Sequence, residues 1–167
     1  LFRSVEKYEP TLLIDEADSF LSGNEDLRGI LDSGHSRAMG FVVRTVGEDL
    51  EPRKFSTWCP KVIAAIGRLA PTLVSRSIRI KMQRKRADDK VVPLRADRLG
   101  HLTPLTRQAW RWHLDNSDKL SDDPNLPEAL HGRGADNWRH LIAIADAAGG
   151  RWPQAARQAA VALEVGD

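Results

Sequence analysis

The chain has 167 residues, 41% of them hydrophobic and 29% charged, with a net charge of +2. This length supports one sizeable core, or a sheet core with a helical addition, and it excludes several full domains. No apolar run approaches the ~20 residues of a membrane-spanning helix, no signal peptide is evident, and the single cysteine, Cys59, excludes an intrachain disulfide. We therefore expect a cytoplasmic protein with no membrane partner.

The first predicted strand ends in two adjacent carboxylates. Residues 1–9 have the pattern of a helix end, and Pro10 breaks that helix. Residues 11–18 then read TLLIDEAD, so the apolar run stops at Asp15 and Glu16. Open α/β sheets bind ligands at the carboxyl ends of their strands, where one carboxylate can hold Mg²⁺ and the next can orient a water. The alternative is a strand end whose carboxylates only cap the following helix.

A helix, a hairpin and a second strand follow. Three cap candidates at residues 22–24 precede a helical pattern that Gly34 can end. Residues 41–46 and 54–58 alternate around a turn-like stretch and predict a β-hairpin. Residues 61–67 form a continuous apolar run, which predicts a second buried strand in a sheet covered on both faces.

The pattern changes from mixed to helical near residues 90–100. Before that point, residues 71–75 predict a helical turn and residues 77–82 a third strand. The later helical patterns lie at residues 110–114, 138–148 and 153–163. We therefore divide the chain into an α/β part, residues 1–95, and a helical part, residues 96–167.

A dense basic stretch lies where the pattern changes. It comprises Arg76, Arg79, Lys81, Arg84, Lys85 and Arg86. One interpretation is a solvated strand end that leads into a linker, and the other is a segment that faces phosphates. The residues alone leave both interpretations open.

Nucleotide hydrolysis of the P-loop kind also needs a glycine-rich phosphate loop, G-x-x-x-x-G-K-[ST], on an earlier strand. The chain contains no such sequence. Because it opens on Leu1 rather than Met, we expect a fragment whose phosphate loop lies upstream. Such a fragment should neither bind ATP tightly nor hydrolyse it.

The order of the elements resembles the AAA+ class of P-loop ATPases. Residues 13–18 are similar to its Walker B element, residues 62–67 to its sensor-one strand, and residues 73–77 to the arginine-finger segment of its helicase branch. The resemblance implies an α/β fold, namely a partial P-loop (AAA+-like) parallel sheet with a β-hairpin, followed by an all-helical lid.

The same resemblance implies ATP and Mg²⁺ as cofactors. Asp15 would hold Mg²⁺, Glu16 would orient the water that attacks the γ-phosphate, and Arg76 would reach the nucleotide of a neighbouring copy. A finger that acts on a neighbour implies a homo-oligomer. An arginine paired with a surface acid is the alternative for Arg76.

Two further arginines are candidates for contact with the nucleotide. AAA+ proteins usually place a polar residue such as Asn at the end of the sensor strand, whereas this chain has Gly67 followed by Arg68, so Arg68 would be a substitute. A helical lid often supplies another arginine from the start of a helix, and Arg139 fits that place better than Arg133. A solvated arginine on an amphipathic helix is the alternative for Arg139.

Residues 26–35, 55–61 and 136–146 more narrowly resemble a domain-of-unknown-function family. Its members occur in bacterial, plasmid and phage proteins that resemble replicative primase-helicases. This implies the ATP-hydrolysing motor module of a DNA helicase or replication-type protein, with nucleic acid as its partner. Two interpretations remain beside it: a noncatalytic ATPase-fold module for nucleic-acid binding or assembly, and a plain α/β scaffold with a helical partner-binding tail.

Two other basic features have alternative roles. The predicted hairpin carries Arg44, Arg53 and Lys54, and hairpins of helicase-branch AAA+ rings grip DNA phosphates. The acidic residues in its turn would repel them. His35 follows a predicted helix end, where it either caps the helix or approaches a phosphate.

Overall fold

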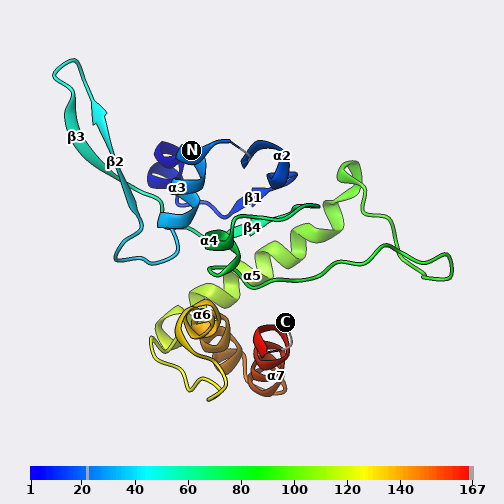
Figure 1. The fold of residues 1–167 in the computed structure, drawn as a ribbon. Helices are drawn as coiled ribbons and strands as arrows, with labels where there is room; N and C mark the ends of the chain where they lie inside the picture. The colour runs from blue at the N-terminus through cyan, green and yellow to red at the C-terminus, as the bar shows by residue number, and fades with distance from the viewer. Residues whose placement is uncertain (22, 166–167) are drawn as a thin grey trace. The chain divides into compact units, whose positions relative to one another are not determined.

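The computed structural model describes residues 1–21 and 23–165, with a small parallel sheet, a small antiparallel sheet and several helices (Figure 1). This mixed α/β composition agrees with the sequence-based prediction at that level. The chain divides into two compact units, Leu1–Ser77 and Ile78–Asp167. The predicted division at residue 95 refers to the parts of a P-loop ATPase and stays a prediction.

The first unit carries the strands. Its helices are α1 (Phe2–Tyr8), α2 (Ala17–Leu21), α3 (Glu25–Ser33) and α4 (Pro71–Val74), and its strands are β1 (Leu12–Ile14), β2 (Phe41–Val46), β3 (Glu51–Ser56) and β4 (Lys61–Ile63). β1 pairs with β4 in parallel, and β2 pairs with β3 antiparallel. The helix, the hairpin and the helical turn therefore form in the order that the sequence predicts.

The parallel sheet covers the core of the first unit with one face only. The buried core residues are Ala17, Leu21, Leu31 and Leu73, with Leu12, Ile14 and Ile63 packed against them. Leu13 and Val62, the central residues of β1 and β4, are 77% and 59% exposed. Side chains alternate along a strand, so an apolar run does not show that both faces are covered. The prediction of a sheet covered on both faces is therefore wrong for the described residues.

Residues 77–82 do not form the predicted third strand. Arg79 and Lys81 alternate with Ile80 and Met82, which is the side-chain pattern of a strand. A strand also needs a hydrogen-bonded neighbour, and no strand pairs with this segment in the part of the chain that the structure describes.

Local signals set the ends of α3 as predicted. Asn24 Oδ1 accepts a hydrogen bond from the Leu27 N–H at 3.0 Å and caps the first turn. Gly34 is the C-cap, and His35 follows it half-buried. The position of His35 at the helix end is therefore as predicted, while its two alternative roles stay open.

The end of α3 packs against the segment that follows the hairpin. Ser33 Oγ and Thr57 Oγ1 share a hydrogen bond of 2.9 Å. Lys61 Nζ donates to three carbonyl oxygens, those of Gly34 and Thr57 at 3.2 Å and that of Cys59 at 3.0 Å. Burial lowers the pKa of the Lys61 ammonium, and the neighbouring Cys59 opposes that shift. These contacts join residues 26–35 to residues 55–61, two of the segments whose sequence resembles a domain-of-unknown-function family. Packing of the two segments against each other therefore accounts for Ser33, Gly34, Thr57 and Lys61.

The second unit is helical. It contains α5 (Thr103–Asn116), α6 (Gly132–Ala148), α7 (Trp152–Val165) and the short 3-10 helices Ala96–Arg98, Gly100–Leu102 and Ser117–Lys119. Its buried cluster is Leu130, Trp138, Ile142 and Ala160. The predicted start of α6 at Trp138 is too late, because Gly132 and Gly134 have low helix propensity and mask the first turn.

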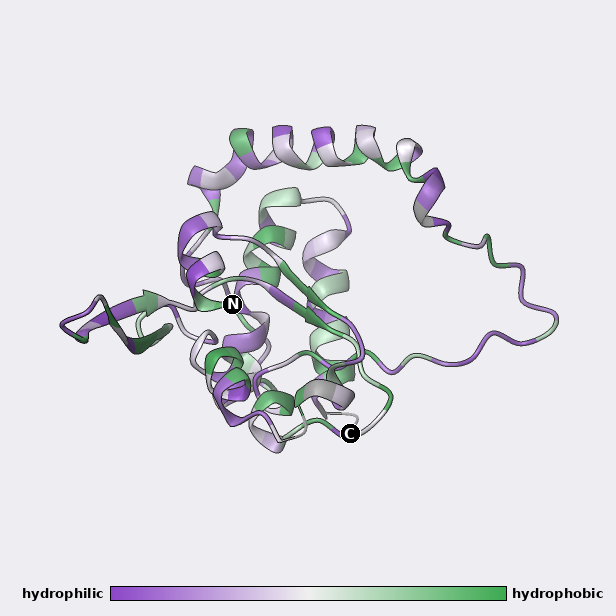
Figure 2. Cartoon of the chain, turned by 90° about the horizontal axis from the view of Figure 1, so that it is seen from above, coloured by the Kyte–Doolittle hydropathy of each residue, from purple (hydrophilic) through white to green (hydrophobic). Residues whose placement is uncertain are grey.

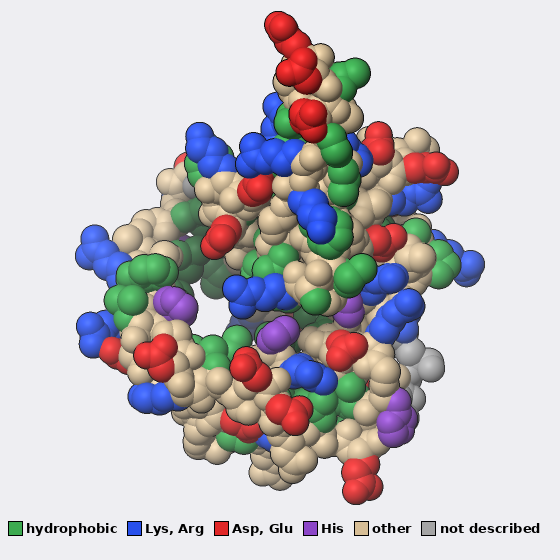
Figure 3. Space-filling view, turned by 90° about the vertical axis from the view of Figure 1, so that its left-hand side faces the viewer, with side chains coloured by type: hydrophobic (Ala, Val, Ile, Leu, Met, Phe, Trp, Pro, Cys, Tyr) green, Lys and Arg blue, Asp and Glu red, His purple; other side chains and the backbone are tan. Residues whose placement is uncertain are grey.

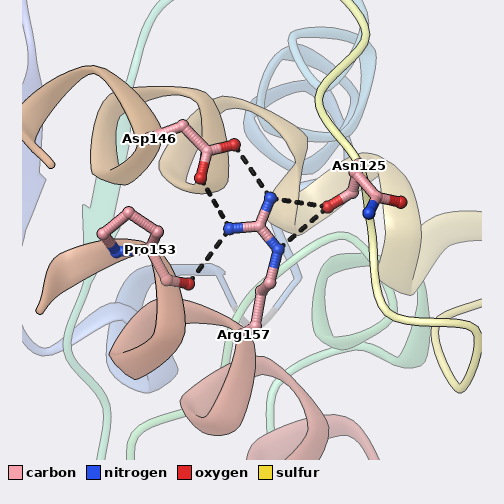
Figure 4. Close-up of polar contacts among 4 residues, drawn as sticks. All are labelled: Asn125, Asp146, Pro153 and Arg157. Atoms are coloured by element: carbon pink, nitrogen blue, oxygen red, sulfur yellow. Dashed lines mark hydrogen bonds and ion pairs between the residues drawn. The ribbon is translucent and has the colours of Figure 1, made fainter.

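Arg157 connects α6 and α7 to the loop that precedes α6 (Figure 4). Arg157 on α7 donates to both carboxylate oxygens of Asp146 on α6, at 2.6 and 2.8 Å. It also donates to the carbonyl oxygens of Asn125, at 2.8 and 3.0 Å, and of Pro153, at 3.0 Å. The hydrogen bonds from Arg157 hold the pKa of the Asp146 carboxyl below its ordinary value. This arginine is therefore a structural residue of the second unit.

The helix α5 buries none of its described side chains, and its Trp110 is 63% exposed. Hydrophobic and hydrophilic residues alternate along it (Figure 2). Among the described residues, no helix combines the length and the hydropathy that a membrane crossing needs.

Candidate functional site

The ends of the two parallel strands bring the predicted catalytic carboxylates to one edge of the sheet. Beyond the strands, the Ala64 N–H donates to the Ile14 carbonyl at 2.8 Å, and the Ala17 N–H donates to the Ala64 carbonyl at 3.0 Å. Asp15 and Glu16 lie between these two contacts in the chain. They therefore occupy the carboxyl edge of the parallel sheet, where α/β sheets hold their ligands.

The turn after β1 holds Glu16 in a left-handed backbone conformation, with φ of 52°. This conformation costs a nonglycine residue about 1–2 kcal/mol. The Glu16 N–H donates to Asp15 Oδ1 at 2.9 Å, and the Glu16 carbonyl accepts from Ser19 Oγ at 2.8 Å. Both Asp15 and Glu16 are exposed. The turn thus leaves both residues accessible, and strain of this kind clusters at functional sites.

Asp18 connects this turn to the segment after β4. Its Oδ1 accepts a hydrogen bond from the Ile66 N–H at 3.1 Å. A Cβ on Gly67 would lie 3.4 Å from the Asp18 Cβ, so the two segments are in close contact. Sequence reasoning gave Asp18 no role, although it is the third carboxylate of the same acidic run.

Arg68 lines a pocket of about 320 Å³ together with Asp18 and Arg28. Apolar side chains and Gly23 form most of the remaining wall. The Arg28 Nε is buried and has no hydrogen-bond partner among the described residues, and its Nη2 lies 3.8 Å from Glu25. Two arginines and one carboxylate therefore border the same small space. Arg28 was missed because nothing in its local sequence separates it from any helix arginine.

Arg76, the predicted finger, follows α4 and is half-buried. Its Nη1 donates to the Thr72 carbonyl at 3.0 Å, so the side chain folds back over the last turn of α4. That contact uses one of the five N–H groups of the guanidinium. The role of Arg76 toward a neighbouring copy stays a prediction.

Arg139, the predicted lid arginine, lies on α6 in the second unit. Its Nη2 is 3.6 Å from Asp136 Oδ1, and its side chain is 40% exposed. An ion pair between these positions of one helix is the ordinary setting of a helix-surface arginine. Its contact with a nucleotide stays a prediction.

No cluster of three or more His, Cys, Asp or Glu side chains able to hold a metal ion occurs in residues 1–21 and 23–165. Mg²⁺ does not require one, because one or two carboxylates, waters and substrate phosphates bind it in nucleotide enzymes. Asp15 offers an exposed carboxylate at the strand end. This donor fits Mg²⁺ that arrives with a nucleotide.

The basic side chains of the hairpin have partners within the first unit. Arg44 Nη2 lies 3.2 Å from Asp26, and Arg53 Nη2 lies 3.5 Å from Glu6. Lys54 Nζ lies over an aromatic ring, 4.6 Å from its centroid. Acidic side chains gather at the protruding tip at the top of Figure 3. The hairpin is thus not a continuous basic surface, and its contact with DNA stays a prediction.

Comparison with protein families places residues 81–166 in the family described as "Protein of unknown function (DUF3631)". The chain belongs to this family. The match covers just over half of the chain and includes all of α5, α6 and α7. Membership of a domain-of-unknown-function family is as the sequence predicts, whereas a link between DUF3631 and P-loop ATPases stays a prediction.

One curated relative is the "Uncharacterized 28.9 kDa protein in xis 5′ region" of Saccharopolyspora erythraea. It is 41% identical over 85 residues, which are 49% of this chain and 31% of the relative. The chain therefore spans about a third of that relative's length. No solved structure matches the chain.

Proposed function

We propose that the chain is the ATP-hydrolysing motor module of a DNA helicase or replication-type protein of bacterial or mobile-element origin. The observation that carries this proposal is the placement of Asp15 and Glu16. Both are exposed at the carboxyl edge of a parallel strand pair, on a turn that holds Glu16 in a strained backbone conformation. Adjacent carboxylates in that place fit the metal and water tasks of nucleotide hydrolysis.

Each residue of the edge then has a separate task. Asp15 would hold Mg²⁺, and Glu16 would position the attacking water and accept its proton. Mg²⁺, when bound, would neutralise part of the negative charge of the nucleotide phosphates. Arg68, with Arg28 beside it in the pocket, offers guanidinium groups to an anionic ligand.

Arg76 completes the site of a neighbouring copy in a homo-oligomer. A guanidinium in that place neutralises charge that develops on the transferred phosphoryl group, and such fingers raise turnover by roughly 10³–10⁵. Arg139 would act on the nucleotide from the helical part. The chain contains no glycine-rich phosphate loop, so this proposal concerns the full-length gene product.

Mixing two inactive variants tests the proposal. Glu16→Gln and Arg76→Ala should each lose turnover alone. An equal mixture should regain up to roughly a quarter of wild-type turnover, because one head-to-tail interface in four combines an intact Glu16 with an intact Arg76. The control mixes Glu16→Gln with the double variant and should stay inactive. A mixture that stays inactive beside an active wild type would exclude action in trans.

The second candidate function is a noncatalytic ATPase-fold module that binds nucleic acid or assembles with other copies. The absence of a phosphate loop from the sequence, and Gly67-Arg68 at the place of the sensor, favour it. This candidate predicts that the full-length product hydrolyses no ATP even when it is folded and oligomeric.

A further inference from the structure

The positive charge of the chain is concentrated in one segment. Residues 79–95 contain seven Lys and Arg against two Asp, a net charge of +5, while the whole chain carries +2, so the rest of the chain is net negative at −3. Every residue of this segment is exposed. The cations are Arg79, Lys81, Arg84, Lys85, Arg86, Lys90 and Arg95.

The segment is an extended loop with no helix or strand (Figure 2). Its one local turn is closed by Asp89, whose Oδ2 accepts from the Arg86 N–H at 2.7 Å. Within the described part of the chain, none of Arg84, Lys85 and Arg86 forms an ion pair. Three consecutive cations without acidic partners repel one another, so an external polyanion would relieve that repulsion.

The structure separates the alternatives for the basic stretch. A solvated strand end requires a strand, and residues 77–82 form none. Burial of a segment in the membrane interface uses an amphipathic helix that satisfies its own backbone, and residues 79–95 contain no helix. Protein interfaces are anchored by aromatic side chains, and this segment has none. Phosphate contacts need only mobile cations along an exposed chain.

We propose that residues 79–95 bind the phosphate backbone of nucleic acid without reading its sequence. This site lies outside the strand-end site and needs no nucleotide. Only the preference for nucleic acid as the polyanion rests in part on the proposed function. Residues two apart in extended backbone lie roughly 6.6 Å from each other, so the side chains of Arg84 and Arg86 can reach different phosphates of one strand.

The test measures binding of fluorescent single-stranded and double-stranded DNA by the whole 167-residue chain, without ATP, as a function of salt. The variant replaces Arg84, Lys85 and Arg86 by Gln. The control replaces the same kinds of residue elsewhere, exposed Arg37, Arg107 and Lys119, by Gln. Loss of three phosphate contacts should make the negative slope of log K against log salt shallower by about 2 for single strands. Between 50 and 200 mM salt, the wild type should then lose roughly twentyfold more affinity than the variant.

Each outcome bears on the proposal. A shallower slope in the variant with an unchanged slope in the control supports it. Comparison of the two DNA probes then shows whether single-stranded or double-stranded DNA is preferred. An equal loss of salt dependence in the variant and the control would mean that DNA is attracted by the charge of the whole chain, and it would overturn the proposal. Absence of DNA binding at 50 mM salt, or binding only to vesicles of anionic lipid, also overturns it. The binding test contains no nucleotide, so failure of the ATPase proposal would leave it intact.

Discussion

Asp18 Oδ1 accepts a hydrogen bond from the Ile66 N–H at 3.1 Å, and this contact joins the turn that carries Asp15 and Glu16 to the segment that carries Arg68. The two segments are far apart in the sequence, yet the parallel pairing of β1 with β4 brings their ends together. One side-chain hydrogen bond therefore fixes two parts of the candidate site relative to each other.

Replacing Asp18 should loosen the Arg68 segment. Asp18→Ala leaves the Ile66 N–H without its acceptor and should lower the free energy of unfolding by about 1 kcal/mol. It should also weaken nucleotide binding by the full-length product. Asp18→Asn keeps an acceptor oxygen and should recover most of both losses. Equal nucleotide affinity in Asp18→Ala and the wild type would show that this contact does not order the site.

Because of the backbone conformation of Glu16, its replacement by glycine should change stability and activity in opposite directions. Glu16→Gly removes the Cβ that strains the left-handed conformation, so stability should stay equal or rise by up to about 1 kcal/mol. ATP hydrolysis should be lost with the carboxylate. Thermal unfolding and turnover of the same preparation check both expectations. A clear loss of stability would mean that the side chain supports the turn.

Two glycines of the α3 region should respond in opposite directions to alanine. A Cβ on Gly34 would overlap the Thr57 carbonyl oxygen and Lys61 Nζ, so Gly34→Ala should destabilise the first unit by about 2–3 kcal/mol. Gly29 lies within α3 with nothing within 4 Å of an added Cβ, so Gly29→Ala should stabilise by about 0.5–1 kcal/mol. Urea unfolding of both variants measures the difference.

The Asp146–Arg157 pair predicts acid sensitivity of the second unit. Because the pKa of Asp146 is lowered in the folded state, its stabilising contribution is present above the unfolded pKa of about 4 and is lost as the pH falls through the folded pKa. Both side chains are partly exposed, so the contribution at neutral pH should be about 1 kcal/mol. Asp146→Asn should be less stable than the wild type at pH 7 and differ little from it at pH 2. A constant difference across this range would contradict the linkage.

Local signals predicted much of the fold. The Asn24 cap and the Gly34 end of α3 are effects of one or two residues on the adjacent backbone, and so is the helical turn at Pro71. The prediction of a strand at residues 77–82 was wrong because a strand needs a distant pairing partner, and the alternation of polar and apolar residues does not reveal one. The same limit applies to the contact of Lys61 with Gly34, which joins two segments that were each singled out but were not predicted to meet.

The candidate site was predictable in part. A strand end followed by Asp15 and Glu16 is a local pattern, and the structure places it at the carboxyl edge of the sheet. Asp18 contacts Ile66 across the fold and Arg28 lines the same pocket, so the sequence order carried no signal for the space they share with Arg68. Roles that depend on a nucleotide or on a second copy, such as that of Arg76, require experiment.

The most direct measurement is Mg²⁺-dependent ATP hydrolysis by the full-length gene product, with and without single-stranded DNA. Glu16→Gln should abolish turnover, while Glu9→Gln should not, although Glu9 is also exposed and has a positive φ of 44°. Single-stranded DNA should stimulate the wild type. Equal turnover in the wild type and Glu16→Gln, or none in a folded and oligomeric wild type, would contradict the account.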